Sequence, residues 1–292
     1  MILEYSYFKN TLNAKLFEDS YSDLIRKIAE NPERYIGLFR PTKPKTKLIQ
    51  NITQSHEIRF GDALEFIFEK YFEAEGFKLH DKRFYTIDNK DLSIDQLFSK
   101  GDTLYMIEQK VRDDHDSTKK VGQFDNFESK FYALTTRYNG VNIIPIMWFI
   151  DDSLMKNKRY YQGRIESMAQ DYGCTPKLYY GEQMFDRNGG IRDFSIEIWN
   201  ETISYLEKWK KTLPDMPEIN FDINANVVFD EIKDISPVVF RKLFTNDDIK
   251  QQIFPIIFPE NKVLNLLCDY FMSKNETIYY NLARHVNAYV YV

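Results

Sequence analysis

Apolar residues along the chain follow first a helical period and then that of strands. Between residues 56 and 75 they recur every three or four positions, and the same spacing returns at 123–138, 160–172 and 194–211. This spacing is typical of helices that bury one face. Between the first two of these segments the period shortens to two, which is typical of strands. Because helices and strands alternate, the sequence predicts an α/β fold.

Two short strands and a turn are predicted between these helices. Residues 92–98 and 104–111 alternate apolar and polar positions, and residues 99–102 between them have the composition of a tight turn. A hairpin closed at this turn brings Asp95 beside Glu108. Further strands are predicted at 141–150 and 177–181, where apolar and β-branched or aromatic residues gather.

Asp95, Glu108 and Lys110 supply the groups that a metal-dependent nuclease needs. Glu108 and Lys110 are two positions apart and therefore project from one face of a strand. Mg²⁺ prefers oxygen ligands and keeps several waters, so two carboxylates and the carbonyl of Gln109 make a plausible protein share of its shell. Lys110 is suited to orient the attacking water or hold the scissile phosphate. We therefore expect Asp95, Glu108 and Lys110 to be catalytic and Asp95, Glu108 and Gln109 to bind Mg²⁺, with Mn²⁺ as a substitute.

The helix at 56–75 offers a fourth acid. Glu65 falls at the edge of its apolar stripe and Glu57 near the middle, whereas the other acids lie on the far side. An acid at the margin can reach the metal site, and Gly61, one turn earlier, would let a backbone or a phosphate approach. Glu65 is the predicted fourth catalytic residue. The alternative is a boundary residue that reaches solvent.

Two polar segments are candidates for contact with DNA. Residues 40–56 carry basic residues and no acid, and Pro41 and Pro44 favour an extended path; a solvated loop is the alternative. Residues 111–123 contain little to bury and begin where the strand with Lys110 ends. The three aspartates in this second segment could bind a second metal ion or orient the lysines, but charge balance is the favoured interpretation. The predicted DNA contacts are Arg40, Lys43, Lys45, Lys47, Arg112, Lys119, Lys120, Gln123 and Lys130. Of these, Gln123 and Lys130 are expected to point away from the buried phenylalanines of the next helix.

The residues around this site resemble the PD-(D/E)XK nuclease superfamily and, within it, the type II restriction endonucleases. The resemblance rests on Ile94-Asp95, on Glu108-Gln109-Lys110 and on Glu65, covers about residues 50–150, and departs from the pattern where Ile94 replaces the usual proline. It implies an αβββαβ core with a mixed central sheet flanked by helices. It also implies Mg²⁺-dependent hydrolysis of double-stranded DNA at a short sequence, within a restriction-modification system. Cleavage of both strands of a palindrome is most simply done by a homodimer.

Composition agrees with a globular enzyme. The chain has 292 residues, of which 43% are hydrophobic, and a net charge of −5 that argues mildly against nucleic acid. Cys174 and Cys268 are isolated, and the sequence shows no signal peptide, membrane span or glycine-rich phosphate loop. These features predict a cytoplasmic protein without a nucleotide cofactor.

The organisation predicted from sequence has three consecutive regions. Residues 1–55 would form a helical region with the basic arm, residues 56–185 the catalytic core, and residues 186–292 a mainly helical region that begins a subdomain after Pro214 and Pro217.

Two other functions stay open. One is a nuclease of DNA repair, recombination or transposition with the same core, and the other is a non-catalytic DNA-binding module.

Overall fold

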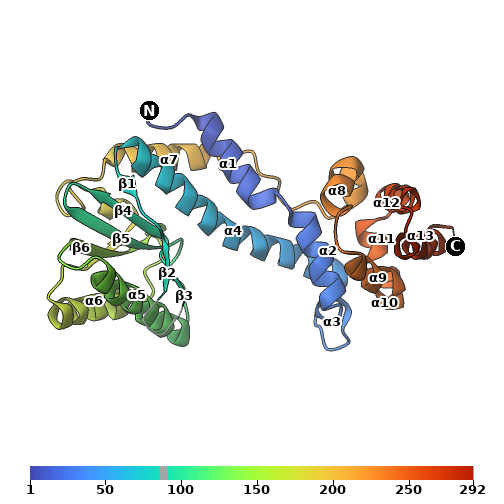
Figure 1. Cartoon of the computed structure of the whole chain (residues 1–292), viewed down its shortest axis with the longest axis horizontal. Helices are drawn as coiled ribbons and strands as arrows, with labels where there is room; N and C mark the ends of the chain where they lie inside the picture. The colour runs from blue at the N-terminus through green and yellow to red at the C-terminus, as the bar shows by residue number, and fades with distance from the viewer. Residues whose placement is uncertain (86–90, 292) are drawn as a thin grey trace. The chain divides into compact units, whose positions relative to one another are not determined.

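The chain folds into two compact units, each built from segments that are distant in sequence (Figure 1). This computed structural model describes residues 1–85 and 91–291. Unit 1 consists of Met1–Leu12 and Phe60–Thr212, and unit 2 of Asn13–Arg59 and Leu213–Val292. The structure thus divides the chain differently from the three consecutive regions predicted above.

Unit 1 contains a five-stranded mixed sheet in the order β1-β4-β5-β6-β7. Its strands are β1 (Lys78–Leu79), β4 (Gln96–Lys100), β5 (Thr103–Lys110), β6 (Asn142–Phe149) and β7 (Lys177–Tyr180). β1 and β4 run antiparallel to their neighbours, whereas β5, β6 and β7 are parallel. The predicted hairpin is confirmed: β4 and β5 pair through a tight turn in which Gly101 has a φ of 57°.

Helices cover both faces of this sheet, as predicted. On one face lie α4 (Pro44–Ala74) and α7 (Ile196–Lys210), where Phe68 of α4 and Trp199 of α7 both contact the ring of Trp148. On the other face lie α5 (Ser117–Arg137) and α6 (Lys158–Tyr172). α5 buries Phe124 and Phe127 against the apolar residues of β4 and β5. Parallel strands need such crossover helices, which explains why α5 and α6 connect β5, β6 and β7.

Three element predictions are wrong in detail. The strand expected at 92–98 is broken, because β3 (Asp91–Ser93) pairs with β2 (Arg83–Tyr85) in a separate two-stranded sheet before β4 begins. α4 begins at Pro44 and not near residue 56, so most of the basic segment is helical; proline is tolerated in the first turn of a helix. α5 begins at Ser117, where the Asp116 side chain accepts hydrogen bonds from two backbone amides and caps the helix.

Unit 2 is entirely helical in the residues described. Its helices are α2 (Ser20–Glu30), α3 (Glu33–Ile36), the first half of α4, η2 (Phe221–Asn224), α8 (Ala225–Ile232), α9 (Pro237–Thr245), α10 (Asp247–Gln252), α11 (Phe254–Ile257), α12 (Lys262–Ser273) and α13 (Thr277–Val290). A single apolar core joins Leu24 and Ile28 of α2 to Phe244, Phe254 and Phe271 from the C-terminal half. The apolar faces of the helices in Asn13–Arg59 and in Leu213–Val292 therefore pack against one another, which explains why these two segments form one unit.

The remaining elements are α1 (Tyr5–Phe17), which passes from unit 1 into unit 2, and η1 (Gly181–Met184), which follows β7. Within residues 1–85 and 91–291, no helix combines the length and the apolar character that crossing a membrane requires.

Candidate active site

The predicted acids and lysine meet where β5 ends. Register places Asp95 opposite Glu108, because the next pair along the ladder is Gln96 with Ile107. Asp95 itself lies in the bend between β3 and β4, so the chain turns from one sheet to the other at this residue. The bend releases its carboxylate from the ladder and lets one oxygen accept a hydrogen bond from the backbone N–H of Gln109 at 2.9 Å.

The ammonium of Lys110 bridges the two carboxylates. Its Nζ lies 2.8 Å from Oδ2 of Asp95 and 2.9 Å from Oε1 of Glu108. Burial opposes the charge on Lys110, but the two adjacent carboxylates outweigh it and raise the pKa of the lysine. Burial, together with the negative charge of Glu108, raises the pKa of Asp95. The site is thus a compact, partly desolvated cluster in which the carboxylates hold a cation between them.

A second lysine reaches the same carboxylate from α5. Nζ of Lys130 lies 2.6 Å from Oε2 of Glu108, and both side chains are almost fully buried, with 5% and 4% exposed. We expected Lys130 to point away from the buried phenylalanines, and this is wrong. The helix carries it inward because Lys130 lies between Phe127 and Phe131 on the turn that faces β5.

Glu65 approaches the cluster from α4. It is half-buried; burial and the charge of Asp95 raise its pKa to about 8, although Lys82 and Lys110 oppose the shift. Glu57, the alternative acid, is exposed and belongs to unit 2. Gly61 faces Val111 across ordinary van der Waals distance, since a Cβ there would lie 3.7 Å from that side chain. The close approach of α4 to the end of β5 is what brings Glu65 near Asp95.

Two further residues hold the bend at Asp95, and sequence reasoning missed both. Lys82 donates to the backbone carbonyl of Asp95 at 2.9 Å and pairs with Glu69 of α4, while its own carbonyl accepts from the backbone N–H of Ile94. The fully buried amide of Gln96 donates to the backbone carbonyl of Glu65 at 2.7 Å. A lysine in a loop and a glutamine in a strand carry no spacing signal, so neither could be found from the pattern.

The oxygens of this cluster fit a hard divalent cation. The carboxylates of Asp95 and Glu108 converge on a single cation, the ammonium of Lys110. In an extended strand the N–H and C=O of one residue point to the same side, so the carbonyl of Gln109 also faces Asp95. Among residues 1–85 and 91–291, no group of three or more His, Cys, Asp or Glu side chains is arranged to hold a metal. Two carboxylates, a carbonyl and waters are a protein share that Mg²⁺ accepts.

Comparison with protein families identifies the chain. Residues 5–88 and 81–210 match the family model of the type II restriction endonuclease HinfI, and this match covers more than half of the chain. The chain belongs to this family. The predicted type II restriction endonuclease is confirmed, and with it a DNA-binding endonuclease. A search of curated proteins finds no significant match.

The predicted DNA contacts of this HinfI-family chain divide between the two units. Arg40, Lys43 and Lys45 in unit 2 are exposed, and Lys47 donates to Gln50. The other five are in unit 1. Arg112 lies near Asp114, Lys119 is exposed, and Lys120 lies over the ring of Tyr160. Gln123 accepts a hydrogen bond from the hydroxyl of Tyr161, and Lys130 forms an ion pair with Glu108. The DNA-binding roles of all nine residues stay predictions.

Asp113 does not balance surface charge, contrary to our expectation. Its carboxylate is fully buried and accepts hydrogen bonds from the backbone and side-chain nitrogens of Asn157 and from the hydroxyl of Tyr180. Asp114 and Asp116 are exposed, and Asp116 caps α5. In this family member Asp113 therefore fastens the segment after β5 to β7 and to the start of α6.

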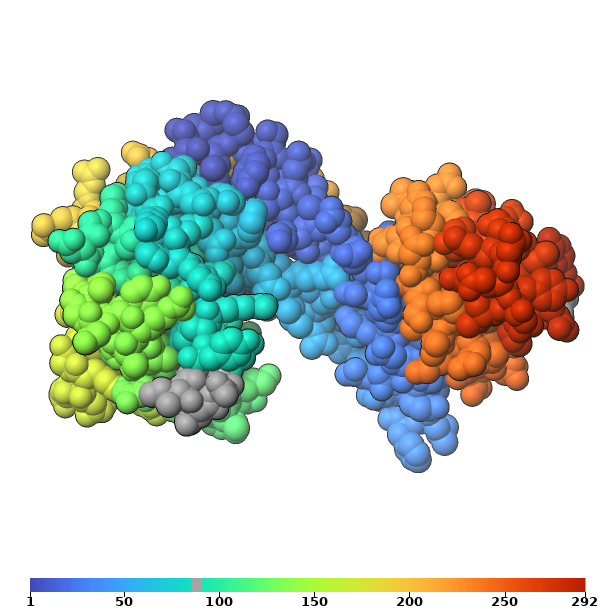
Figure 2. Space-filling view, in the orientation of Figure 1, coloured from blue at the N-terminus to red at the C-terminus, as the bar shows by residue number. Residues whose placement is uncertain are grey.

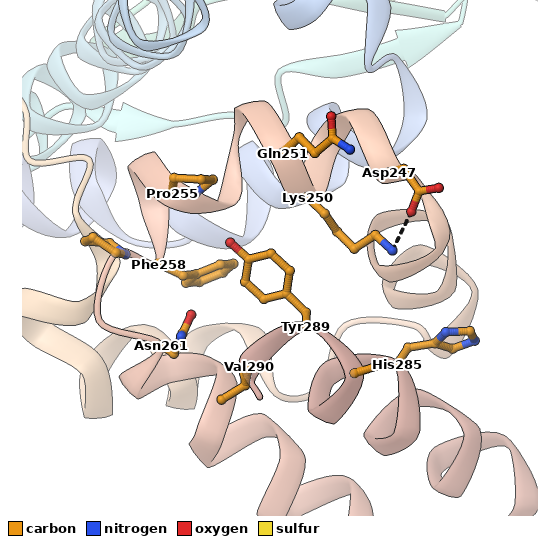
Figure 3. Close-up of a pocket in the computed structure, with 11 residues that line it drawn as sticks. Asp247, Lys250, Gln251, Pro255, Phe258, Asn261, His285, Tyr289 and Val290 are labelled. Carbon is orange, nitrogen blue, oxygen red and sulfur yellow. Dashed lines mark ion pairs between the residues drawn. The ribbon is translucent and has the colours of Figure 1, made fainter. Parts of the chain in front are cut away.

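A separate cavity of about 670 Å³ lies in unit 2 (Figure 3). Lys250 pairs with Asp247 at its rim, and the rings of Phe258 and Tyr289 line its floor. It contains none of the residues predicted to be catalytic. The predicted catalytic residues Asp95, Glu108 and Lys110 meet instead at the end of β5.

Proposed function

We propose that the chain is a Mg²⁺-dependent restriction endonuclease that hydrolyses phosphodiester bonds of double-stranded DNA at a short specific sequence, as part of a restriction-modification system. The observation that carries this proposal is the Lys110 ammonium held between the Asp95 and Glu108 carboxylates at the end of a β-hairpin. The order α4-β1-β4-β5-α5-β6 supports a PD-(D/E)XK core, with β2 and β3 as an added ribbon.

The residues have distinct tasks in this proposal. Asp95, Glu108 and the carbonyl of Gln109 would hold Mg²⁺, which supplies Lewis acidity to the scissile phosphate and to the attacking water. Lys110 would donate a hydrogen bond to the attacking water or to a phosphate oxygen and stabilise the growing negative charge. Lys130 stays on Glu108 and keeps that carboxylate in position. Glu65 is placed to exchange a proton with groups at the site, because burial and the charge of Asp95 raise its pKa to about 8.

The first prediction concerns these residues. Asp95→Asn, Glu108→Gln and Lys110→Met should each lower the cleavage rate about 10²-fold or more, because each removes a charge that acts on the phosphate or holds the cation. Cleavage of plasmid DNA with Mg²⁺ measures the rate. Binding with Ca²⁺ should stay largely intact and shows that the variants are folded. The matched control is Asp102→Asn, an exposed aspartate in the turn of the same hairpin.

Three outcomes would count against the assignments. A wild-type rate in any of the three variants removes that residue from the site. Glu65→Gln should give a smaller defect, and a larger defect in Glu57→Gln would show that the fourth carboxylate is misplaced. Digestion of phage DNA followed by sequencing of the ends tests specificity: discrete ends support a restriction enzyme, whereas a smear of ends indicates a non-specific nuclease.

A further inference from the structure

An apolar pair is presented to solvent at the tip of unit 2. The loop between α3 and α4 exposes 89% of Leu38 and 97% of Phe39. This part of the chain forms a protruding tip, light blue in Figure 2. Single exposed apolar residues are common on protein surfaces, but two adjacent large side chains with almost no cover are not.

The tip is a defined turn. The backbone N–H of Arg40 donates to the carbonyl of Gly37 at 3.1 Å, which places Leu38 and Phe39 at the two central positions. Gly37 is required there, because a Cβ would lie 2.6 Å from the carbonyl oxygen of Glu33. Central positions of turns usually carry polar residues or glycine. The side chains of Leu38 and Phe39 therefore bury almost no apolar surface and do not stabilise the fold at these positions.

Three basic residues follow the turn. Arg40, Lys43 and Lys45 are exposed, and none of them forms an ion pair with any residue in the described part of the chain. Lys45 and Lys47 lie in the first turn of α4, which holds no acid. The dipole of a helix disfavours cations at this end and favours anions. Bound phosphates would remove both the repulsion among these side chains and the unfavourable dipole interaction.

We propose that Leu38 and Phe39 insert between neighbouring base pairs of duplex DNA while Arg40, Lys43 and Lys45 contact the flanking phosphates. Apolar wedges of this kind unstack a base step and bend the duplex, and the cost is offset by added contacts. Charge complementarity selects DNA as the occupant, because an apolar pair followed by the exposed cations Arg40, Lys43 and Lys45 suits a polyanion with an apolar interior. This inference rests on the proposed function, since it needs DNA as the partner.

The experiment follows base stacking directly. Duplexes that carry 2-aminopurine at successive positions of the cleavage site are titrated with protein in Ca²⁺. Wild type should raise the fluorescence at one step, and the double variant Leu38→Ala/Phe39→Ala should abolish that rise and weaken binding roughly tenfold or more. Phe39→Trp should retain the signal. Val227→Ala removes another exposed apolar side chain of unit 2 and should change neither result.

A second series separates the wedge from the phosphates. Arg40→Gln/Lys43→Gln/Lys45→Gln should weaken binding to all sequences about alike and flatten its salt dependence, whereas the double alanine variant should leave the salt slope unchanged. An unchanged slope in this triple glutamine variant would overturn the phosphate contacts.

The remaining outcomes decide between this inference and its basis. One outcome would overturn the wedge alone. In it, the wild type cleaves and binds DNA without a rise in 2-aminopurine fluorescence at any step, and the double alanine variant binds normally. If the double variant instead changes sedimentation of the protein without DNA, the tip contacts a second copy of the chain and the wedge is wrong. Failure of wild type to bind or cut DNA at all would remove the proposed function itself.

Discussion

At the scale of single residues, the site depends on how buried charges are paired. Glu108 is almost fully buried and has a lysine on each carboxylate oxygen, Lys110 on one and Lys130 on the other. An unpaired charge in such a place is costly, and the two lysines together balance the carboxylates of Glu108 and Asp95. Both side chains of the ion pair between Lys130 and Glu108 are buried, so solvent screens this interaction little.

Lys130→Met should therefore affect both stability and catalysis. We expect the free energy of unfolding to fall by about 3 kcal/mol, because a buried carboxylate loses one of its partners. Cleavage at saturating Mg²⁺ should fall on the order of 10²-fold, because Glu108 loses a contact that positions it. Denaturant unfolding and plasmid cleavage measure the two effects.

Lys130→Arg keeps the charge and should retain more activity than the methionine variant. Arg137→Met, which changes an exposed basic residue at the end of α5, is the control. Full activity in Lys130→Met would show that Lys110 alone suffices.

The sequence predicted the residues of this site that obey a spacing rule. Strand alternation put Glu108 and Lys110 on one face, and the hairpin put Asp95 opposite Glu108, as the structure has them. Lys82 and the inward direction of Lys130 were missed for a physical reason. Both depend on contacts between elements, and a pattern within one element carries no information about them.

At the scale of elements, α4 decides where the site lies. Its central part contacts the end of β5 at Gly61 and carries Glu65 toward Asp95, while its first half belongs to unit 2. Its apolar stripe was predicted from residue 56, because the lysines and prolines before that point mask the helical period. The start at Pro44 follows from packing of Leu48 and Ile52 into the core of unit 2, which the stripe of the second half does not reveal.

His56 in the same helix predicts a dependence of stability on pH. Burial, together with the charge of Arg59, lowers the pKa of His56 below its usual 6.5. Its Nε2 lies 3.4 Å from the hydroxyl of Ser20, and its ring packs edge-on against Phe17. The unfolded chain therefore takes up a proton on His56 at a higher pH than the folded chain does. The stabilisation is present above pH 6.5 and is lost as the pH falls through the lowered pKa.

We expect the free energy of unfolding of wild type to fall between pH 7.5 and 5.5 by more than that of His56→Gln. Urea unfolding at both values measures the difference. His285→Gln changes an exposed histidine of the same unit and should behave as wild type does. Equal pH dependence in wild type and His56→Gln would mean that the histidine is as accessible to protons in the folded protein as in the unfolded one.

At the scale of the whole molecule, the sequence indicated helical additions but not their assembly. Helices from both ends of the chain share one core, and α7 covers the sheet of unit 1 although it lies beyond the predicted end of the catalytic core. Such pairing of distant segments depends on which apolar faces complement one another. Periodicity shows that a face is apolar but not which partner covers it.

The last prediction concerns assembly on DNA. Each chain has one site with Asp95, Glu108 and Lys110, whereas two sites are the simplest way to cut both strands of a palindrome. A C₂ dimer provides one site for each strand, because its two-fold axis matches that of the DNA. Sedimentation with Ca²⁺ should therefore show two chains on one palindromic duplex. Mixed dimers of wild type and Asp95→Asn should nick one strand of a plasmid, whereas wild-type dimers linearise it. One chain per duplex, together with linear product from the mixture, would contradict the dimer and require a single site to cut both strands in turn.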